Sequence, residues 1–138
     1  IHGANMAIRR TALITVGGFD EVLGPGTSVP AAEDCDLLWR LCSFGYSGYY
    51  EPKIKVSHHH RRQNESSKLK LLKQYEIGRG AYWVKAILDS RRQKQALKNM
   101  YWSWRSEFRG EKSPKDILST MRNELVGALK YLNARYLR

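Results

Sequence analysis

The sequence has few cysteines and no long hydrophobic run. No apolar stretch approaches the roughly 18 residues that a membrane-spanning helix needs, and the opening IHGANMAIRR lacks the basic-then-apolar order of a signal peptide. The two cysteines, Cys35 and Cys42, stand in one predicted helix. Their separation along its axis is about 10 Å, which is beyond the reach of a disulfide. These absences predict a reduced, cytoplasmic protein.

Acidic residues become scarce after residue 52. Residues 1–52 carry three Lys/Arg against six Asp/Glu, whereas residues 53–138 carry 21 against seven, within a net charge of +11. The first part is therefore acidic and the second strongly basic. A basic surface of this kind is typical of proteins that bind a polyanion, and both nucleic acid and anionic lipid fit.

The period of the apolar residues also changes along the chain. Alternation of apolar and polar residues predicts half-buried strands at residues 4–9 and 54–60. A short helix is expected from Thr11, as a possible N-cap, to the glycines that follow Val16. Longer helices are predicted over residues 33–44, 66–90, 94–108 and from Ser113-Pro114 onward.

Three acidic residues gather where a loop rich in Gly and Pro meets a predicted helix. The loop contains Gly24 and Gly26, and the first helical turn contains Glu33, Asp34 and Asp36. Acids in a first turn stabilise a helix by roughly 0.3–1 kcal/mol each, so capping is one interpretation. A catalytic carboxylate is the other, because such loops commonly position ligand contacts on a rigid scaffold.

Four short motifs follow one another over residues 3–60. They are N-M-A-x-R-R, G-G-F-D-E, a Gly-rich loop that ends in E-D-x-D-L-x-x-R, and Y-x-P-x-x-x-V-x-H. In this order they resemble the C-terminal half of a family 2 glycosyltransferase catalytic domain. The resemblance implies an α/β fold. Residues 1–63 would be a partial GT-A domain lacking its N-terminal nucleotide-binding half, and residues 64–138 a basic helical extension. The absence of an initiator Met agrees with a piece of a longer chain.

Enzymes of this family transfer a sugar from a nucleotide-sugar to an acceptor hydroxyl, with inversion at the anomeric carbon. The resemblance implies that Asp34 is the general base that takes the acceptor proton. It places Glu33, Gly24 and Gly26 at the acceptor or substrate. Asp36 is interpreted as a cap.

The family also uses Mg²⁺ or Mn²⁺, which neutralises the leaving diphosphate. The main ligands are expected from an Asp-x-Asp motif in the missing N-terminal half, because the triplet 34–36 follows the loop and lies on a helix. The resemblance places His58 at the metal or the diphosphate, and Arg61 is a candidate contact to the substrate. His58 and His60 share a strand face that His59 opposes, so the three histidines do not chelate one ion tightly.

The expected function is inverting sugar transfer to a glycan or a lipid-linked acceptor in glycan or polysaccharide biosynthesis. Residues 63–67 do not match the Q-x-x-R-W motif of processive synthases, which favours transfer of one or a few sugars. The isolated chain is expected to be inactive.

Two other interpretations use the basic helices, which also carry Tyr82, Trp83, Trp102 and Trp104. A nucleic-acid-binding module is one, and a surface that lies on anionic membrane at the inner face is the other. The aromatic residues have helical spacing, which indicates core packing rather than base stacking. The membrane surface therefore ranks above nucleic acid.

Overall fold

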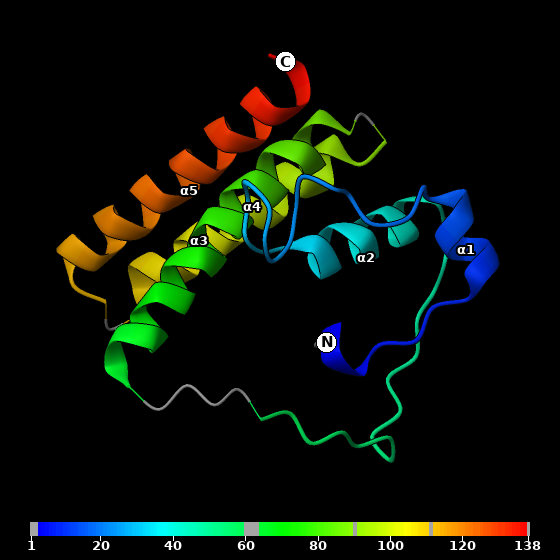
Figure 1. The fold of residues 1–138 in the computed structure, drawn as a ribbon. Coiled ribbons are helices and arrows are strands. Elements are labelled where there is room, and N and C mark those ends of the chain that lie inside the picture. Colours follow the sequence, from blue (N-terminus) through cyan, green and yellow to red (C-terminus); the bar gives the residue numbers. More distant parts are fainter. Residues whose placement is uncertain (1–2, 60–63, 90, 111, 138) are drawn as a thin grey trace.

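The computed structural model describes residues 3–59, 64–89, 91–110 and 112–137. All the regular elements in these ranges are helical (Figure 1). They are η1 (Gly3–Asn5), α1 (Arg10–Thr15), α2 (Glu33–Ser43), α3 (Glu65–Leu88), α4 (Gln93–Arg109) and α5 (Pro114–Tyr136). The three long helices lie together, and the shorter helices and the loop between α1 and α2 lie to one side of them.

The expected α/β fold, a partial GT-A domain, is wrong, since the described residues form no strand and no sheet. Residues 4–9 form part of η1 and an irregular connection, and residues 46–59 run as an exposed segment outside any element. A strand needs a neighbour for its backbone N–H and C=O groups, and the described chain offers none. Ile54 and Val56 therefore have the alternation of a strand but no neighbouring strand in the described chain. Both side chains are more than half exposed.

The expected helices after residue 32 are confirmed within one or two residues, and the signals at their starts explain why. The Asn64 side chain accepts the Ser67 N–H (2.9 Å) at the start of α3. Ser113 and Asp116 form a reciprocal capping box at the start of α5, as a Ser-Pro start favours. Thr11 is not an N-cap, because α1 begins at Arg10 and has no side-chain cap.

Helices α4 and α5 both pack against α3. Helices α3 and α5 run in the same direction because α4 returns the chain between them (Figure 1). Their backbones approach too closely for any side chain at two positions. A Cβ on Gly80 would overlap the Glu124 carbonyl oxygen, and a Cβ on Gly127 would overlap the Ile77 carbonyl oxygen. These two glycines therefore set the distance between α3 and α5.

Two apolar clusters complete the interior. One lies between α1 and α2 and consists of Ala12, Val16, Leu37 and Leu41. The other joins the loop before α2 to the long helices and consists of Leu23, Val29, Ile77, Ala81 and Tyr131. Gly78 leaves room for this loop, since a Cβ there would lie 2.7 Å from the Cβ of Ala31. The loop that carries the candidate site thus rests on α3.

Replacing Gly80 by Ala should separate α3 from α5. Because the added methyl group meets backbone rather than a movable side chain, we expect Gly80→Ala to lower the free energy of unfolding by about 1–3 kcal/mol or more. Urea unfolding followed by circular dichroism measures the change. Gly48→Ala is the control, since a Cβ there meets nothing within 4 Å. Equal stability of the two variants would contradict the close approach.

Candidate functional site

The loop before α2 folds back on itself around Thr27. The Thr27 hydroxyl oxygen lies 2.7, 2.9 and 2.8 Å from the carbonyl oxygens of Val22, Gly24 and Val29, and it accepts the Val29 N–H (3.2 Å). Gly24 and Gly26 have φ of +112° and +88°, a region that side chains disfavour. The two glycines therefore shape the turn. Thr27 was missed from the sequence, although a hydroxyl in a Gly-rich turn is a recognised signal.

The loop enters α2 through a strained residue. Ala32, the residue before the first helical turn, has a left-handed backbone with φ of 79° and no side-chain capping bond. Residues other than glycine rarely adopt this conformation unless the surrounding structure imposes it. Because Ala31 is buried against α3, the position of the loop imposes the turn. The turn fixes where the carboxylates of the next residues lie.

Asp34 and Glu33 form the outer side of the site. The Asp34 carboxylate accepts the Cys35 N–H (2.8 Å) and the Gly3 N–H (3.2 Å). A carboxylate has about four acceptor positions, so Asp34 keeps capacity for a further proton donor. Glu33 lies over Gly24, since a Cβ there would be 3.5 Å from the Glu33 side chain. The structure thus brings together three of the predicted residues.

The thiol of Cys35 does not compete as a nucleophile at this site. Although Cys35 as a residue is exposed, partial desolvation of its thiol, followed by the charge of Asp34, raises the pKa of Cys35 to about 11. The thiolate that a nucleophile requires is therefore scarce at neutral pH.

Asp36 has a different environment from Asp34 and is not a cap. It is 2% exposed and accepts two hydrogen bonds from Arg40, at 2.9 and 2.7 Å. Lys85 on α3 lies 2.7 Å from its other oxygen. Arg40 also donates to the Val16 carbonyl oxygen at 2.5 Å. Asp36 and Arg40 therefore hold α2 against α1 and α3.

Lys85 bridges two carboxylates. Its ammonium group lies 2.6 Å from Asp20 as well as 2.7 Å from Asp36, and the Tyr131 hydroxyl donates to Asp20 at 3.2 Å. Burial raises the pKa of Asp20, but hydrogen bonds from Lys85, the Val22 N–H and Tyr131 outweigh it, so that pKa lies below its ordinary 3.8. Asp20, Asp36, Arg40, Lys85 and Tyr131 are called the ion cluster below.

A hollow of about 470 Å³ opens beside the ion cluster, between α2, α3 and α5. Its wall includes Asp36, Arg40 and Lys85, and Asp89 and Arg91 form an ion pair of 2.9 Å at its rim. Arg135 also lines the hollow, so that four cations face two carboxylates there. Asp34 is not among the lining residues, so the hollow and the candidate base are separate features.

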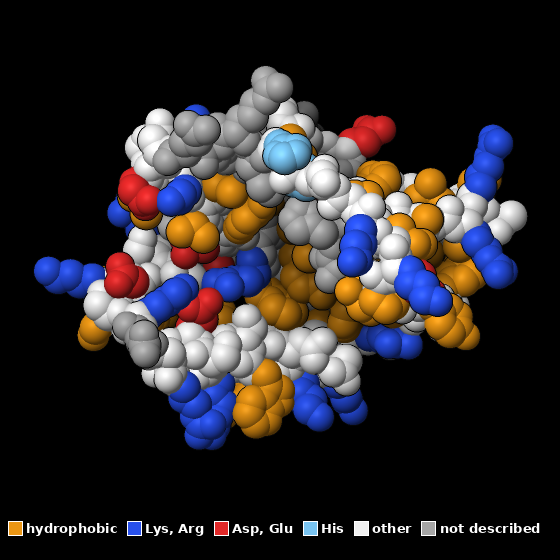
Figure 2. Space-filling view, turned by 90° about the horizontal axis from the view of Figure 1, so that it is seen from below, with side chains coloured by type: hydrophobic (Ala, Val, Ile, Leu, Met, Phe, Trp, Pro, Cys, Tyr) orange, Lys and Arg blue, Asp and Glu red, His pale blue; other side chains and the backbone are white. Residues whose placement is uncertain are grey.

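The remaining predicted residues do not join Asp34. His58 lies on the exposed segment 46–59, which the Asn5 side chain holds through the Ile54 carbonyl oxygen (3.1 Å). Figure 2 shows histidine at the surface. Arg61 and His60 lie outside the described residues. In the described part of the chain, no group of three or more His, Cys, Asp or Glu is arranged to hold a metal.

Part of the chain is similar to known enzymes. Over 63 residues it is 41% identical to the pre-mycofactocin glycosyltransferase of two strains of Mycobacterium tuberculosis. The chain is therefore similar to a glycosyltransferase. The match covers 46% of this chain and 12% of each relative, so the chain spans about one eighth of the length of these relatives. No family model and no solved structure matches it.

Replacing Lys85 by Met should leave two carboxylates, the buried Asp36 and the partly buried Asp20, without their shared cation. We expect Lys85→Met to lower the free energy of unfolding near pH 7 by about 3 kcal/mol. A carboxylate with a lowered folded pKa stabilises the protein above its unfolded pKa, and this contribution is lost as the pH falls through the folded pKa. The difference between the two proteins should therefore shrink as the pH falls below about 3.8.

Urea unfolding at a series of pH values measures this difference. Lys68→Met is the matched control, because Lys68 pairs with Glu65 on the surface, where both side chains are more than half exposed. A surface pair contributes about 0–1 kcal/mol. A loss in Lys85→Met that is no larger than in the control, or that stays constant with pH, would contradict the role of Lys85.

Proposed function

We propose that this chain is part of an enzyme that transfers a sugar from a nucleotide-sugar to an acceptor hydroxyl, with Asp34 as the general base. The observation that carries the proposal is the 41% identity over 63 residues to a glycosyltransferase. The different environments of the neighbouring acids support the choice of residue. Asp36 is enclosed by cations, whereas Asp34 lies at the loop and keeps free acceptor positions.

The proposed step is a single displacement. The Asp34 carboxylate accepts the proton of the acceptor hydroxyl as the hydroxyl oxygen attacks the anomeric carbon. The bond between that carbon and the diphosphate oxygen breaks on the opposite face, and its electron pair leaves with the nucleoside diphosphate. The product has inverted configuration at the anomeric carbon. Asp34 ends the step protonated and returns its proton to solvent.

The residues around Asp34 would orient it for this step. The N–H groups of Gly3 and Cys35 fix the carboxylate plane, and the buried pair of Asp36 and Arg40 fixes α2. Glu33 lies one residue away over Gly24 and would accept a hydrogen bond from a second acceptor hydroxyl. Such positioning reduces the entropy lost in the transition state.

A divalent metal does not fit the described residues alone, which contain no cluster of three ligands. Mg²⁺ or Mn²⁺ therefore enters the proposal only as an ion held mainly by residues outside this chain, where it would neutralise the leaving diphosphate. His58 is a candidate for one ligand. No step above passes through the ion.

The acceptor is proposed to be a glycan or a lipid-linked glycan that receives one or a few sugars. The sequence after the histidines, Gln63 to Ser67, lacks the Q-x-x-R-W motif of processive synthases. Transfer in the cytoplasm, as part of glycan or polysaccharide biosynthesis, belongs to the same proposal.

Asp34→Asn in the complete enzyme should lower turnover by roughly 10²–10⁴ with little change in donor affinity, because the amide keeps the shape of the side chain but cannot take the proton. Asp36→Asn is the matched control, two residues away in the same motif. We expect Asp36→Asn to lower the unfolding midpoint and Asp34→Asn to leave it nearly unchanged. Steady-state rates and thermal unfolding of both variants measure this. Near-normal turnover of Asp34→Asn would refute the assignment.

The 138-residue chain alone should not bind a nucleotide-sugar tightly, because the nucleotide-binding half is expected outside it. Titration calorimetry with a panel of nucleotide-sugars and Mn²⁺ measures binding to the chain and to the complete enzyme. We expect heat of binding only with the complete enzyme. Micromolar binding to the chain would show that the donor site lies within these residues.

A further inference from the structure

Helices α4 and α5 each expose a row of large apolar side chains. The rows consist of Leu97, Tyr101 and Phe108 on α4 and of Leu118, Leu125, Leu129 and Tyr136 on α5. These seven residues are called the apolar rows. Successive members are four or seven residues apart, so each row follows one face of its helix. Every member on α5 is more than half exposed.

The two rows meet where α4 ends and α5 begins. Phe108 lines a small apolar groove together with Ile117 and Met121. Met121 stands three residues after Leu118 and four before Leu125, and is therefore on the same side of α5. The groove joins the rows into one apolar surface over two helices.

Basic side chains outnumber acidic ones on α4 and α5, and two of the three described acids there are paired with cations. The basic residues of α4 and α5 are Lys94, Lys98, Arg105, Arg109, Lys115, Arg122, Lys130 and Arg135. Within the described residues none of these eight forms an ion pair. Glu107 pairs with Arg79 (3.0 Å) and Lys112 (2.5 Å). Glu124 is buried beside Arg79 and Trp104, and Asp116 bonds to Ser113 (2.7 Å).

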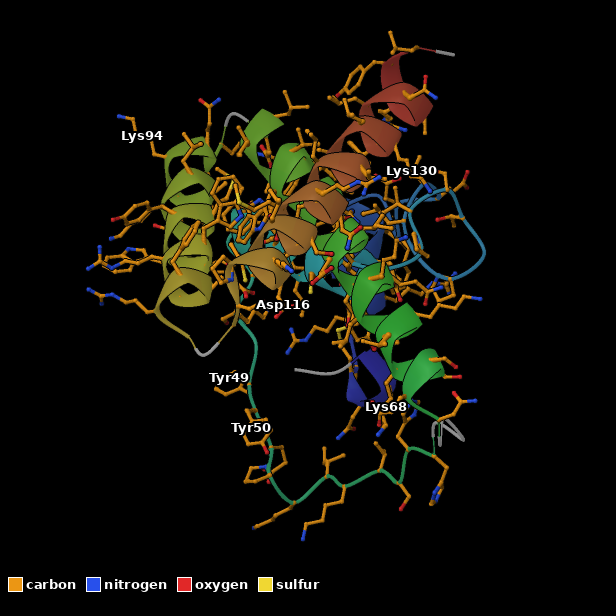
Figure 3. The ribbon with its side chains drawn as sticks, turned by 90° about the vertical axis from the view of Figure 1, so that its left-hand side faces the viewer. Tyr49, Tyr50, Lys68, Lys94, Asp116 and Lys130 are labelled. Atoms are coloured by element: carbon orange, nitrogen blue, oxygen red, sulfur yellow. The ribbon has the colours of Figure 1, made fainter. Side chains whose placement is uncertain are left out.

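The figures show how the charged side chains are distributed. Along the lower edge of Figure 2, Lys and Arg side chains project beside hydrophobic ones with no Asp or Glu in view. Acidic side chains lie among Lys and Arg at the left, the side that Figure 3 turns toward the viewer. Figure 3 faces α4 and α5 and shows Lys94 and Lys130 far from Asp116 along the two helices. The outer face is thus apolar and mainly basic, and Asp116 is the exposed acid among the described residues of α4 and α5.

We propose that this face of α4 and α5 lies on an anionic membrane surface. The cations attract acidic lipid headgroups, and the apolar rows enter the boundary between headgroups and acyl chains to about 5–10 Å. Tyr101 and Tyr136 suit this depth, since tyrosine combines an apolar ring with a polar tip. In the part of the chain that is described, no helix is long and apolar enough to cross a membrane.

The composition of the surface favours lipid over other occupants. A second copy of the chain carries the same +11 charge, so pairing these faces would bring like charges together. A nucleic acid would satisfy the cations but would leave Leu118, Leu125 and Leu129 without apolar partners. An anionic bilayer offers negative charge and an apolar layer side by side.

Attachment through this face leaves the candidate base accessible. The apolar rows are exposed on α4 and α5, whereas α2 packs on α3, where Trp39 and Tyr82 make an edge contact at 6.3 Å between ring centres. Asp34 is not part of the surface. The proposal therefore stands whether or not Asp34 is a catalytic base.

Sedimentation with vesicles tests the proposal. The chain is mixed with phosphatidylcholine vesicles that either contain or lack phosphatidylserine, at low and high salt. We expect binding only to the vesicles with phosphatidylserine, weakened at high salt. Leu125→Gln with Leu129→Gln should weaken binding by at least about tenfold. This double variant removes two apolar side chains that would be buried in the bilayer, and it does not change the charge. Leu69→Gln with Leu72→Gln, two exposed leucines of α3 outside the surface, should change it by less than about twofold.

Several results would overturn the proposal. Equal binding to both kinds of vesicle, or none to either, would remove the anionic membrane as partner. An equal effect of the two double variants would show that the surface is not the contact. Self-association that the α5 variant abolishes, without lipid binding, would make a second copy the occupant. Tight binding to RNA without lipid binding would assign the face to nucleic acid. Circular dichroism of each variant confirms that it remains folded.

Discussion

The ammonium group of Lys85 joins the N-terminal part of the chain, up to α2, to the three long helices. Lys85, in the middle of the structure, lies within 2.7 Å of a carboxylate from the loop after α1 and of another from α2. Charges this far from water are stable only when each has its partner. Arg40 and Tyr131 complete the set. The loop, α2, α3 and α5 therefore depend on the same cluster for their relative positions.

This dependence explains why one short acidic motif holds two kinds of carboxylate. Asp36 faces inward to the ion cluster, and Asp34 faces the loop and the backbone of Gly3. Residues i and i+2 of a helix point about 200° apart around its axis. Asp34 and Asp36 have this spacing, so their side chains meet different environments. The buried acid positions the helix, and the outer acid is left with acceptor capacity for chemistry.

The fold was predictable from the sequence only where local signals decide. Helix starts depend on caps within a few residues, so the start of α5 was found at Ser113. The start of α3 was expected at residue 66, one residue after its observed start, and its Asn64 cap was not recognised. The strand expectation at 54–60 failed because a strand is completed by a partner, and alternation of Ile54 and Val56 says nothing of where that partner is. At the site, the pairing of Asp36 with Arg40 could be read from its spacing of four. Lys85 could not, since it lies 49 residues from Asp36.

The bond between Tyr131 and Asp20 joins residues 111 positions apart, and this has a consequence for the order of folding. Helices α3, α4 and α5 follow one another in the sequence. They can associate early, because contacts between neighbouring elements close only short stretches of chain. The loop before α2 cannot reach its final place until α5 has been synthesised. During translation Asp20 would therefore lack its bond from Tyr131 until α5 emerges, whereas Arg40 and Lys85 are available to Asp36 earlier. We infer that the loop before α2 is among the last parts of the molecule to order, although it stands near the beginning of the sequence.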